Sequence, residues 1–162
     1  MNQIKVTNAK TLVAQDSIIA SGEKGDCVVY AVASAFDLPY DEAHQVVKDK
    51  FNRQDRKGTK SWTILNKMKD MAGTRESING KFVREILERP TKTYHLHGKD
   101  VVRKNRVSTF IKEHTQGTYL ILTGDHALVS KDGEMIDNVT GGSAKAFVKV
   151  VYKVEPLITF QP

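Results

Sequence analysis

The feature that most constrains the fold of this chain is the small, apolar run at residues 28–35, which follows Gly25-Asp26-Cys27. Such a run predicts a buried helix, and Cys27, the only cysteine of the chain, would stand at its start. A helix N-terminus carries unpaired N–H groups and the positive end of the backbone dipole, which favour a thiolate over a thiol. Cys27 is therefore a candidate nucleophile. The alternative interpretation is a small, buried hydrophobic residue.

A histidine and a carboxylate follow far downstream. His126 lies in Gly124-Asp125-His126-Ala127, and Asp137 and Asn138 follow the turn signal Asp132-Gly133. A cysteine, a distant histidine and a later carboxylate or amide form the pattern of nucleophile, base and orienting residue.

The turn signal permits a geometric prediction. Asp132-Gly133 predicts a two-residue hairpin loop that pairs Lys131 with Glu134 and, further out, Leu128 with Asp137. His126 and Asp137 would then be diagonal neighbours on one face, close enough for a carboxylate–imidazole hydrogen bond. Asn138 would point the other way, and a longer loop or a bulge would reverse the choice. Asp137 is thus the predicted orienting residue, with Asn138 in reserve. The alternative is an exposed hairpin whose histidine has no role.

These motifs together resemble small papain-like cysteine peptidases, in particular uncharacterised members encoded by phages and other mobile elements. In those proteins an acidic-Cys-Val stretch begins the first core helix, an Arg-Lys-Gly-Thr stretch follows the second helix, and a Gly-His-Ala strand supplies the base. This chain has Arg56-Lys57-Gly58-Thr59 at the matching place. The resemblance spans roughly residues 20–140 and implies a papain-like fold in which the cysteine helix packs across an antiparallel sheet.

Two positions depart from the papain pattern. The glutamine that completes the oxyanion hole a few residues before the cysteine is absent, and residues 21–24 are Ser-Gly-Glu-Lys. Gln15 is the nearest upstream glutamine and is the candidate oxyanion residue, beside the backbone N–H of Cys27. The aromatic residue after the cysteine is replaced by Val28. Loss of one oxyanion donor reduces transition-state stabilisation by about 2.7–4 kcal/mol.

Length and composition predict one domain over residues 1–162, with a core over about residues 20–154. No apolar stretch approaches the roughly 20 residues of a membrane span, and the first residues lack the pattern of a signal peptide. We therefore expect a cytoplasmic protein, in the host cytoplasm if a phage encodes it, without a membrane partner. A single cysteine excludes an internal disulfide framework.

The order of elements predicts the α+β class with an antiparallel sheet, because helices come first and strands later. Asp41 and Ser61 are suitable helix N-caps. The expected helices are residues 26–36, 41–51, 61–71, 80–88 and 107–113. The expected strands are residues 93–97, 118–122, 126–130, 134–138 and 146–154, with a short one at 4–7.

The formal charge of +6 raises the question of an acidic partner. The densest basic segment, residues 99–106, is expected to be a solvated loop, with a phosphate-binding edge as the alternative. A looser cluster lies near Trp62, as in single-strand binders, although Trp62 is also a natural packing residue. That cluster contains Arg53, Arg56, Lys57 and Lys60.

No metal or other cofactor is predicted. His95 and His97 would share one face of a strand, but no further residues complete a ligand set at the required spacing. The turn at Gly141-Gly142-Ser143 lacks the ending of a phosphate loop.

The predicted function is cysteine-dependent acyl transfer on a peptide or protein substrate, with peptide or isopeptide hydrolysis by Cys27, His126 and Asp137. Transamidation or deamidation would use the same three residues. The alternative, from another class, is a catalytically inactive papain-like domain that binds a host protein or nucleic acid through its basic surface. Nothing in the sequence predicts the oligomeric state.

Overall fold

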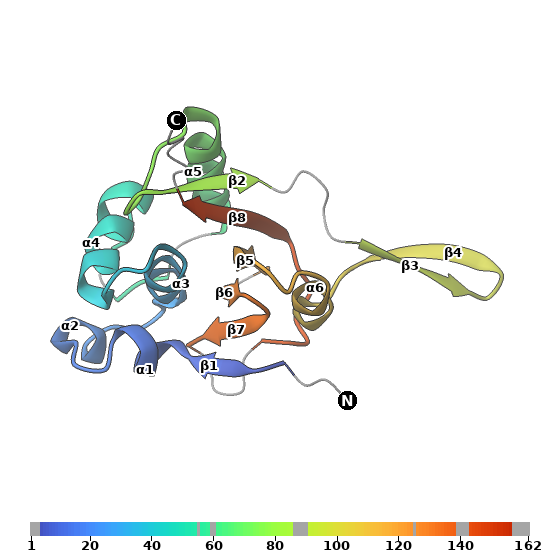
Figure 1. Ribbon diagram of the computed structural model, residues 1–162, viewed down its shortest axis with the longest axis horizontal. Helices are drawn as coiled ribbons and strands as arrows, with labels where there is room; N and C mark the ends of the chain where they lie inside the picture. Colours follow the sequence, from blue (N-terminus) through green and yellow to red (C-terminus); the bar gives the residue numbers. More distant parts are fainter. Residues whose placement is uncertain are drawn as a thin grey trace, which may run out of the picture.

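The computed structural model describes residues 4–54, 56–58, 61–85, 91–124, 126–138 and 143–156, which form helices and a mixed sheet (Figure 1). The helices are α1 (Ala9–Val13), α2 (Ile18–Ser21), α3 (Cys27–Phe36), α4 (Tyr40–Phe51), α5 (Ser61–Thr74) and α6 (Val107–Glu113). The strands are β1 (Val6–Asn8), β2 (Lys81–Glu85), β3 (Thr91–Leu96), β4 (Lys99–Lys104), β5 (Thr118–Leu122), β6 (Ala127–Lys131), β7 (Glu134–Asp137) and β8 (Val150–Pro156). The α+β class is as predicted.

The main sheet has the strand order β1-β7-β6-β5-β8-β2, and β3 and β4 form a separate two-stranded sheet. The neighbours from β7 to β2 are antiparallel, but β1 runs parallel to β7, with Thr7 opposite Ile136. The prediction of an antiparallel sheet is therefore wrong at this edge. A parallel pair requires a long crossover connection, and nearly the whole chain separates these two strands.

The sheet lies between two helical layers, with α3 on one face and α6 on the other (Figure 1). Side chains alternate between the two faces along a strand, so β5, β6, β7 and β8 each contribute to both cores. The core on the α3 side includes Leu120, Leu122, Val129, Ile136, Tyr152 and Val154. The core on the α6 side includes Tyr119, Ile121, Leu128, Met135, Val148 and Val151.

Helix α3 is the most deeply buried helix of the α3-side core. Its nine residues after Cys27 are each at most 3 % exposed, as the apolar sequence predicts. Alanines at positions 31, 33 and 35 have small side chains, so the helix backbone can approach the sheet closely. The helix ends at Asp37, whose φ of 55° is left-handed, and Pro39 follows. Cys27 is thus the first residue of a helix fixed along its length.

The predicted helix at residues 80–88 is wrong. Lys81–Glu85 form strand β2, which pairs antiparallel with β8, and residues 86–88 lie outside the described part of the chain. Asn79 and Gly80 both have positive φ and start the strand with a turn. Pairing with the valine-rich β8 overrides the local helical pattern.

Other boundaries differ less. The ranges 107–113 and 118–122 match α6 and β5, whereas α1 and α2 were not predicted. Asp41 is not an N-cap, because Pro39 precedes the first turn of α4 and the Asp41 carboxylate accepts a hydrogen bond from Ser17. Ser61 is the first residue of α5. No described helix combines the length and apolar character needed to cross a membrane.

The basic segment at residues 99–106 is not a loop. Residues 99–104 form β4, which joins β3 through a tight turn at His97 and Gly98, both with positive φ. The resulting two-stranded ribbon projects away from the main sheet (Figure 1). The prediction of a loop failed because β4, Lys-Asp-Val-Val-Arg-Lys, has no apolar–polar alternation of its own and is a strand through its pairing with β3.

The β6–β7 turn confirms the two-residue loop, since Asp132 and Gly133 have φ of 49° and 83°. Gly133→Ala places an L-residue in the left-handed region, so we expect roughly 1–2 kcal/mol less stability. Gly73→Ala is the matched control, because Gly73 lies in α5 with nothing within 4 Å of an added Cβ, and we expect no loss there. Urea unfolding of both variants measures the difference, and equal effects would contradict this assignment of the turn.

Candidate active site

The β6–β7 hairpin brings His126 and Asp137 together. The register pairs Lys131 with Glu134 and Val129 with Ile136, as the two-residue turn predicts. His126 stands immediately before β6 and Asp137 is the last residue of β7. Their side chains meet, with His126 Nε2 2.6 Å from Asp137 Oδ1. The diagonal contact predicted from the turn is therefore present.

The Asp137 carboxylate is fully buried, and both of its oxygens have partners. Oδ1 contacts His126, while Oδ2 accepts a 2.9 Å hydrogen bond from the Ser143 hydroxyl. Sequence reasoning missed Ser143, which it treated only as part of a glycine-rich turn. The one signal was a hydroxyl residue six positions after Asp137, and such residues are too common to single it out. Ser143 holds the carboxylate that orients the imidazole.

Cys27, from the N-terminal part of the chain, is the third residue of the cluster. It is the first residue of α3, is partly buried, and its side chain interacts with the His126 imidazole and raises the pKa of that ring. Because Nε2 is bonded to Asp137, Nδ1 is the ring nitrogen left for Cys27. The structure therefore brings together a thiol, an imidazole and a buried carboxylate in the predicted chain order.

The electrostatics of the cluster favour a charged imidazole. Burial by itself would lower the pKa of His126, but the hydrogen bonds to Asp137 and Cys27 and the negative charges of both residues raise it to about 10. At neutral pH the His126 ring is then an imidazolium. In this state the ring carries a proton that it can donate.

The residue before Cys27 does not cap α3. Asp26 is buried and makes no side-chain hydrogen bond to the helix; its Oδ2 instead accepts a 2.6 Å hydrogen bond from the Tyr40 hydroxyl. Burial and this hydrogen bond raise the pKa of Tyr40, so the phenol remains a donor. The contact holds a negative charge away from the first-turn N–H groups beside the thiol.

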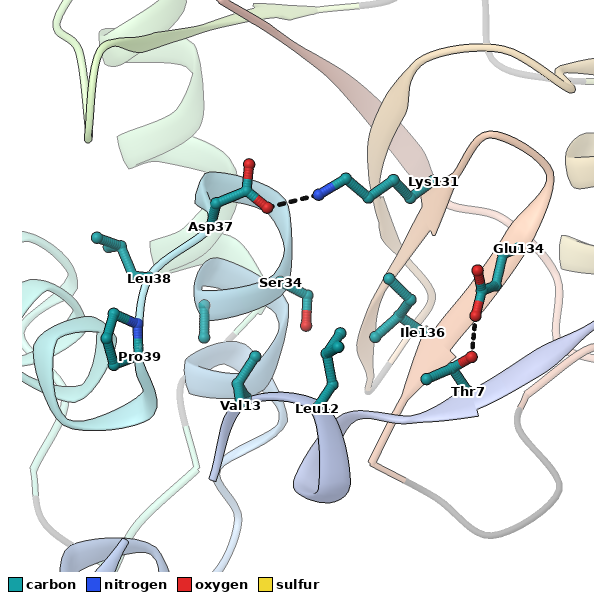
Figure 2. Close-up of a pocket in the computed structure, with 11 residues that line it drawn as sticks. Thr7, Leu12, Val13, Ser34, Asp37, Leu38, Pro39, Lys131, Glu134 and Ile136 are labelled. Carbon is teal, nitrogen blue, oxygen red and sulfur yellow. Dashed lines mark hydrogen bonds and ion pairs between the residues drawn. The ribbon is translucent and has the colours of Figure 1, made fainter. Parts of the chain in front are cut away.

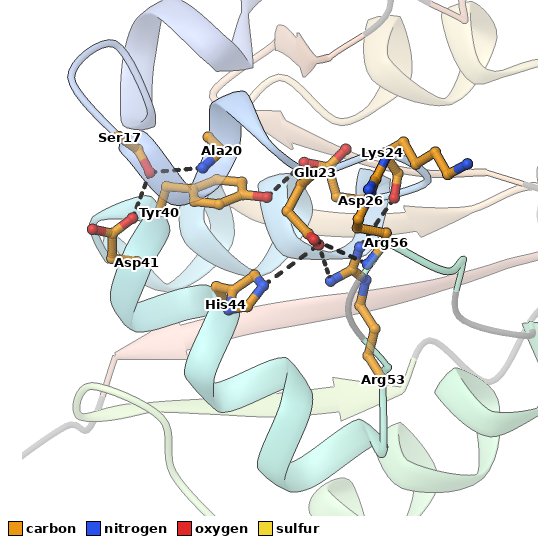
Figure 3. A network of polar contacts seen from close by, with 10 residues as sticks. All are labelled: Ser17, Ala20, Glu23, Lys24, Asp26, Tyr40, Asp41, His44, Arg53 and Arg56. Atoms are coloured by element: carbon orange, nitrogen blue, oxygen red, sulfur yellow. Dashed lines mark hydrogen bonds and ion pairs between the residues drawn. The ribbon is translucent and has the colours of Figure 1, made fainter.

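A buried ion pair anchors the loop that leads into Cys27 (Figure 3). The Glu23 carboxylate, 5 % exposed, pairs with the Arg53 guanidinium, 2 % exposed, and lies 3.4 Å from His44 Nε2. The backbone N–H of Arg56 donates to Glu23 at 2.9 Å, and Arg53 donates to the carbonyl of Lys24 at 3.1 Å. The loop before the helix is thus fixed to the segment after α4.

Two glycines let these segments touch. Gly25 has a φ of 63°, and a Cβ there would lie 3.0 Å from the backbone nitrogen of Gly58. The Arg56-Lys57-Gly58 stretch therefore packs against the residue two positions before Cys27, and Thr59 lies outside the described residues. Any side chain at Gly25 would separate the two segments.

This arrangement changes the interpretation of the basic cluster near Trp62. Arg53 is buried and neutralised by Glu23, so its charge does not face a ligand. Lys60 lies outside the described residues, and of Trp62 the structure describes only its place in α5. Arg56 and Lys57 remain exposed. The basic cluster is therefore divided: Arg53 belongs to the buried ion pair, whereas Arg56 and Lys57 lie on the surface.

Gln15 and Asn138 are not part of the three-residue cluster as described. Gln15 is exposed between α1 and α2 and lines a cavity with Ser17 and Asp41, and neither Cys27 nor His126 lines that cavity. Asn138 follows β7, and its buried Oδ1 accepts no hydrogen bond from a described residue. Asp137, rather than the reserve Asn138, contacts the imidazole.

Within the described ranges, no group of three or more histidine, cysteine, aspartate or glutamate residues is arranged to hold a metal ion. Comparisons with protein-family models, curated proteins and solved structures return no significant match for this chain.

The buried ion pair generates a stability prediction. Arg53→Met leaves the Glu23 carboxylate buried without its main partner, which we expect to cost about 3–5 kcal/mol. Adding Glu23→Gln removes the stranded charge while keeping an acceptor for the Arg56 N–H, so stability should largely return. Arg84→Met is the control, since its pair with Glu155 is exposed. Urea unfolding measures all three, and a double variant no more stable than Arg53→Met would contradict the pairing.

The raised pKa of His126 generates a pH prediction. Its pKa rises from 6.5 unfolded to about 10 folded, so its stabilising contribution is complete below pH 6.5 and is lost as pH rises through about 10. NMR of the His126 ring should show an imidazolium at pH 8, and Cys27→Ser or Asp137→Asn should move its titration to lower pH. Unfolding free energy relative to His126→Gln should fall between pH 7 and 10. A neutral ring at pH 8 would refute the ion pair.

Proposed function

We propose that this chain is a papain-like cysteine-dependent acyl-transfer enzyme, with peptide or isopeptide hydrolysis as its reaction. The observation that carries the proposal is the His126 imidazole, which contacts Cys27 on one side and the buried Asp137 carboxylate, at 2.6 Å, on the other. A purely structural cysteine would not need a charged histidine beside it. The position of Cys27 at the start of α3 supports the same role.

The acylation step uses Cys27 as the nucleophile and the His126 imidazolium as the acid. The Cys27 thiolate attacks the substrate carbonyl carbon, forming a C–S bond, while the carbonyl π electrons move to the oxygen. The oxyanion then collapses, the C–N bond breaks, and the His126 imidazolium gives its proton to the departing amine. Asp137 keeps the ring oriented and stabilises its positive charge, and Ser143 holds Asp137.

The deacylation step reverses the proton transfer. Neutral His126 takes a proton from water, whose oxygen attacks the thioester carbonyl; the C–S bond breaks and the thiolate re-forms. The first-turn N–H groups of α3 are the donors best placed for the oxyanion, since the Asp26 side chain does not occupy them. Neither Cys27 nor His126 lines the cavity that Gln15 lines, and we assign the oxyanion hole to backbone groups.

The basic surface supports the second candidate function, an inactive papain-like domain that binds nucleic acid or a host protein. The exposed β3–β4 ribbon carries Lys99 and continues towards Arg106, in a chain with a formal charge of +6. A phosphate-driven binder loses affinity steeply as salt rises, so retention on nucleic acid that falls with salt, in a chain whose thiol is unreactive, would favour this candidate.

The rate of Cys27 alkylation by iodoacetamide as a function of pH tests the enzyme proposal, because the chain has one cysteine. We expect rapid alkylation at pH 6–7 in the wild type and a profile displaced to higher pH in His126→Ala. His95→Ala, an exposed histidine on the ribbon, is the matched control and should leave the profile unchanged. In a peptide and isopeptide substrate screen, His126→Ala should lower turnover about 10²–10⁴-fold.

Two further variants test the contribution of Asp137 and of Ser143 to the reactivity of the thiol. Asp137→Asn should also displace the alkylation profile, and Ser143→Ala should do so less, because it removes one hydrogen bond to the carboxylate rather than the carboxylate itself. A wild-type thiol that alkylates slowly at pH 7, or one indifferent to His126, would mean that Cys27 is structural and would refute the enzyme proposal.

A further inference from the structure

A second potential site lies at the other end of α3. A cavity of about 570 Å³ opens between α1, the last turn of α3 and strands β1, β6 and β7 (Figure 2). Its α3 residue Ser34 is seven positions beyond Cys27, which corresponds to about 10 Å along the helix axis. Neither Cys27, His126 nor Asp137 lines it. The cavity is therefore separate from the cluster described above, and its volume is in the range of small-molecule sites.

The walls of the cavity are mainly apolar. Leu12 and Val13 come from α1 and Ile136 from β7, while Leu38 and Pro39 come from the segment after α3. Leu12 is 53 % exposed and marks the opening towards solvent. An open, preformed, apolar-walled cavity is suited to a largely apolar ligand.

One polar group inside the cavity has no partner among the residues that the structure describes. Ser34 is 3 % exposed, and its Oγ makes no hydrogen bond to a described residue. In Figure 2 its hydroxyl is directed towards the space between Leu12 and Ile136. A buried hydroxyl without a partner is costly, and a ligand group that bonds to it would remove that cost.

The charged groups around the cavity are already paired. Asp37 Oδ1 accepts from Lys131 at 2.5 Å, and its other oxygen contacts Lys81. Burial opposes ionisation of Asp37, but the hydrogen bonds from Lys131 and Lys81 outweigh it and lower the pKa of the carboxyl. Thr7 donates to Glu134 on the opposite side (Figure 2). No described charge in the lining is left for an ionic ligand.

We propose that this cavity binds a neutral, largely apolar small molecule that carries a single hydroxyl or carbonyl group, with Ser34 Oγ as its hydrogen-bonding partner. The apolar walls select the hydrocarbon part, the orphan hydroxyl fixes its orientation, and the internally paired charges give no advantage to an ionised ligand. The site does not depend on the Cys27 chemistry, and Cys27→Ala should bind the same ligand.

NMR titration with thymol, p-cymene and p-isopropylbenzoate tests the proposal. Thymol is p-cymene with one added hydroxyl, and the benzoate is a charged relative of similar shape. We expect thymol to shift the methyl signals of Ile136, Leu12 and Val13. Ser34→Ala should weaken thymol binding about three- to tenfold, the effect of losing one hydrogen bond, and leave p-cymene binding unchanged.

Ser130→Ala is the matched control. Ser130 is a fully buried serine on β6 whose hydroxyl also lacks a hydrogen bond to a described residue, but it does not line the cavity. Its substitution should leave the binding of both ligands unchanged. Ser34→Ala should also unfold at the same temperature as the wild type or higher, because it removes an unpaired buried hydroxyl.

Three outcomes would overturn the proposal. The first is that thymol does not shift the cavity methyl groups, or binds Ser34→Ala as tightly as the wild type. The second is tighter binding of the benzoate than of thymol, which would assign the cavity to an anion. The third is a clearly lower unfolding temperature for Ser34→Ala, which would show that the hydroxyl already has a partner within the protein.

Discussion

Burial of α3 against the sheet is the constraint on which the site depends. Each fully buried valine or phenylalanine side chain contributes roughly 1.5–3 kcal/mol, and α3 places several of them in one core. A shift of the helix along its axis would expose them or leave cavities, so the position of its first turn is determined by packing further along. Cys27, the one residue of the helix that is not fully buried, is therefore held in place by residues outside the cluster that it forms with His126 and Asp137.

Two independent structural features position the residues around the first turn of α3. A hairpin whose register follows from a two-residue turn presents His126 and Asp137, and a buried ion pair between Glu23 and Arg53 anchors the loop that enters the helix. The first is set by backbone pairing and the second by charge. Because neither relies on the other, the imidazole and the thiol are positioned from opposite sides by elements that can be altered separately.

The parts of the fold predicted from sequence are those set by local signals. The apolar run of α3, the Asp132-Gly133 turn and the His126–Asp137 contact follow from periodicity and turn chemistry. The elements that were predicted wrongly depend on distant partners. Strand β2 was mistaken for a helix because its pairing with β8 is not visible in the local sequence. Strand β1 pairs in parallel with β7, which lies near the other end of the chain. The Glu23–Arg53 pair was likewise invisible, because nothing in the sequence links residues so far apart. Ser143 was missed for another reason: a hydroxyl residue six positions after a carboxylate is too common to be a signal.

The parallel pairing of β1 with β7 also bears on the order in which contacts form during folding. Thr7 and Glu134, which bond across these strands, are 127 residues apart, and Cys27 and His126 are 99 residues apart. During synthesis Cys27 leaves the ribosome well before His126, so the nascent chain carries the thiol before the imidazole. Contacts of such long range form slowly, because the chain between the partners must close into a loop first. The cluster of Cys27, His126 and Asp137 therefore exists only once two distant stretches of chain have entered the same core.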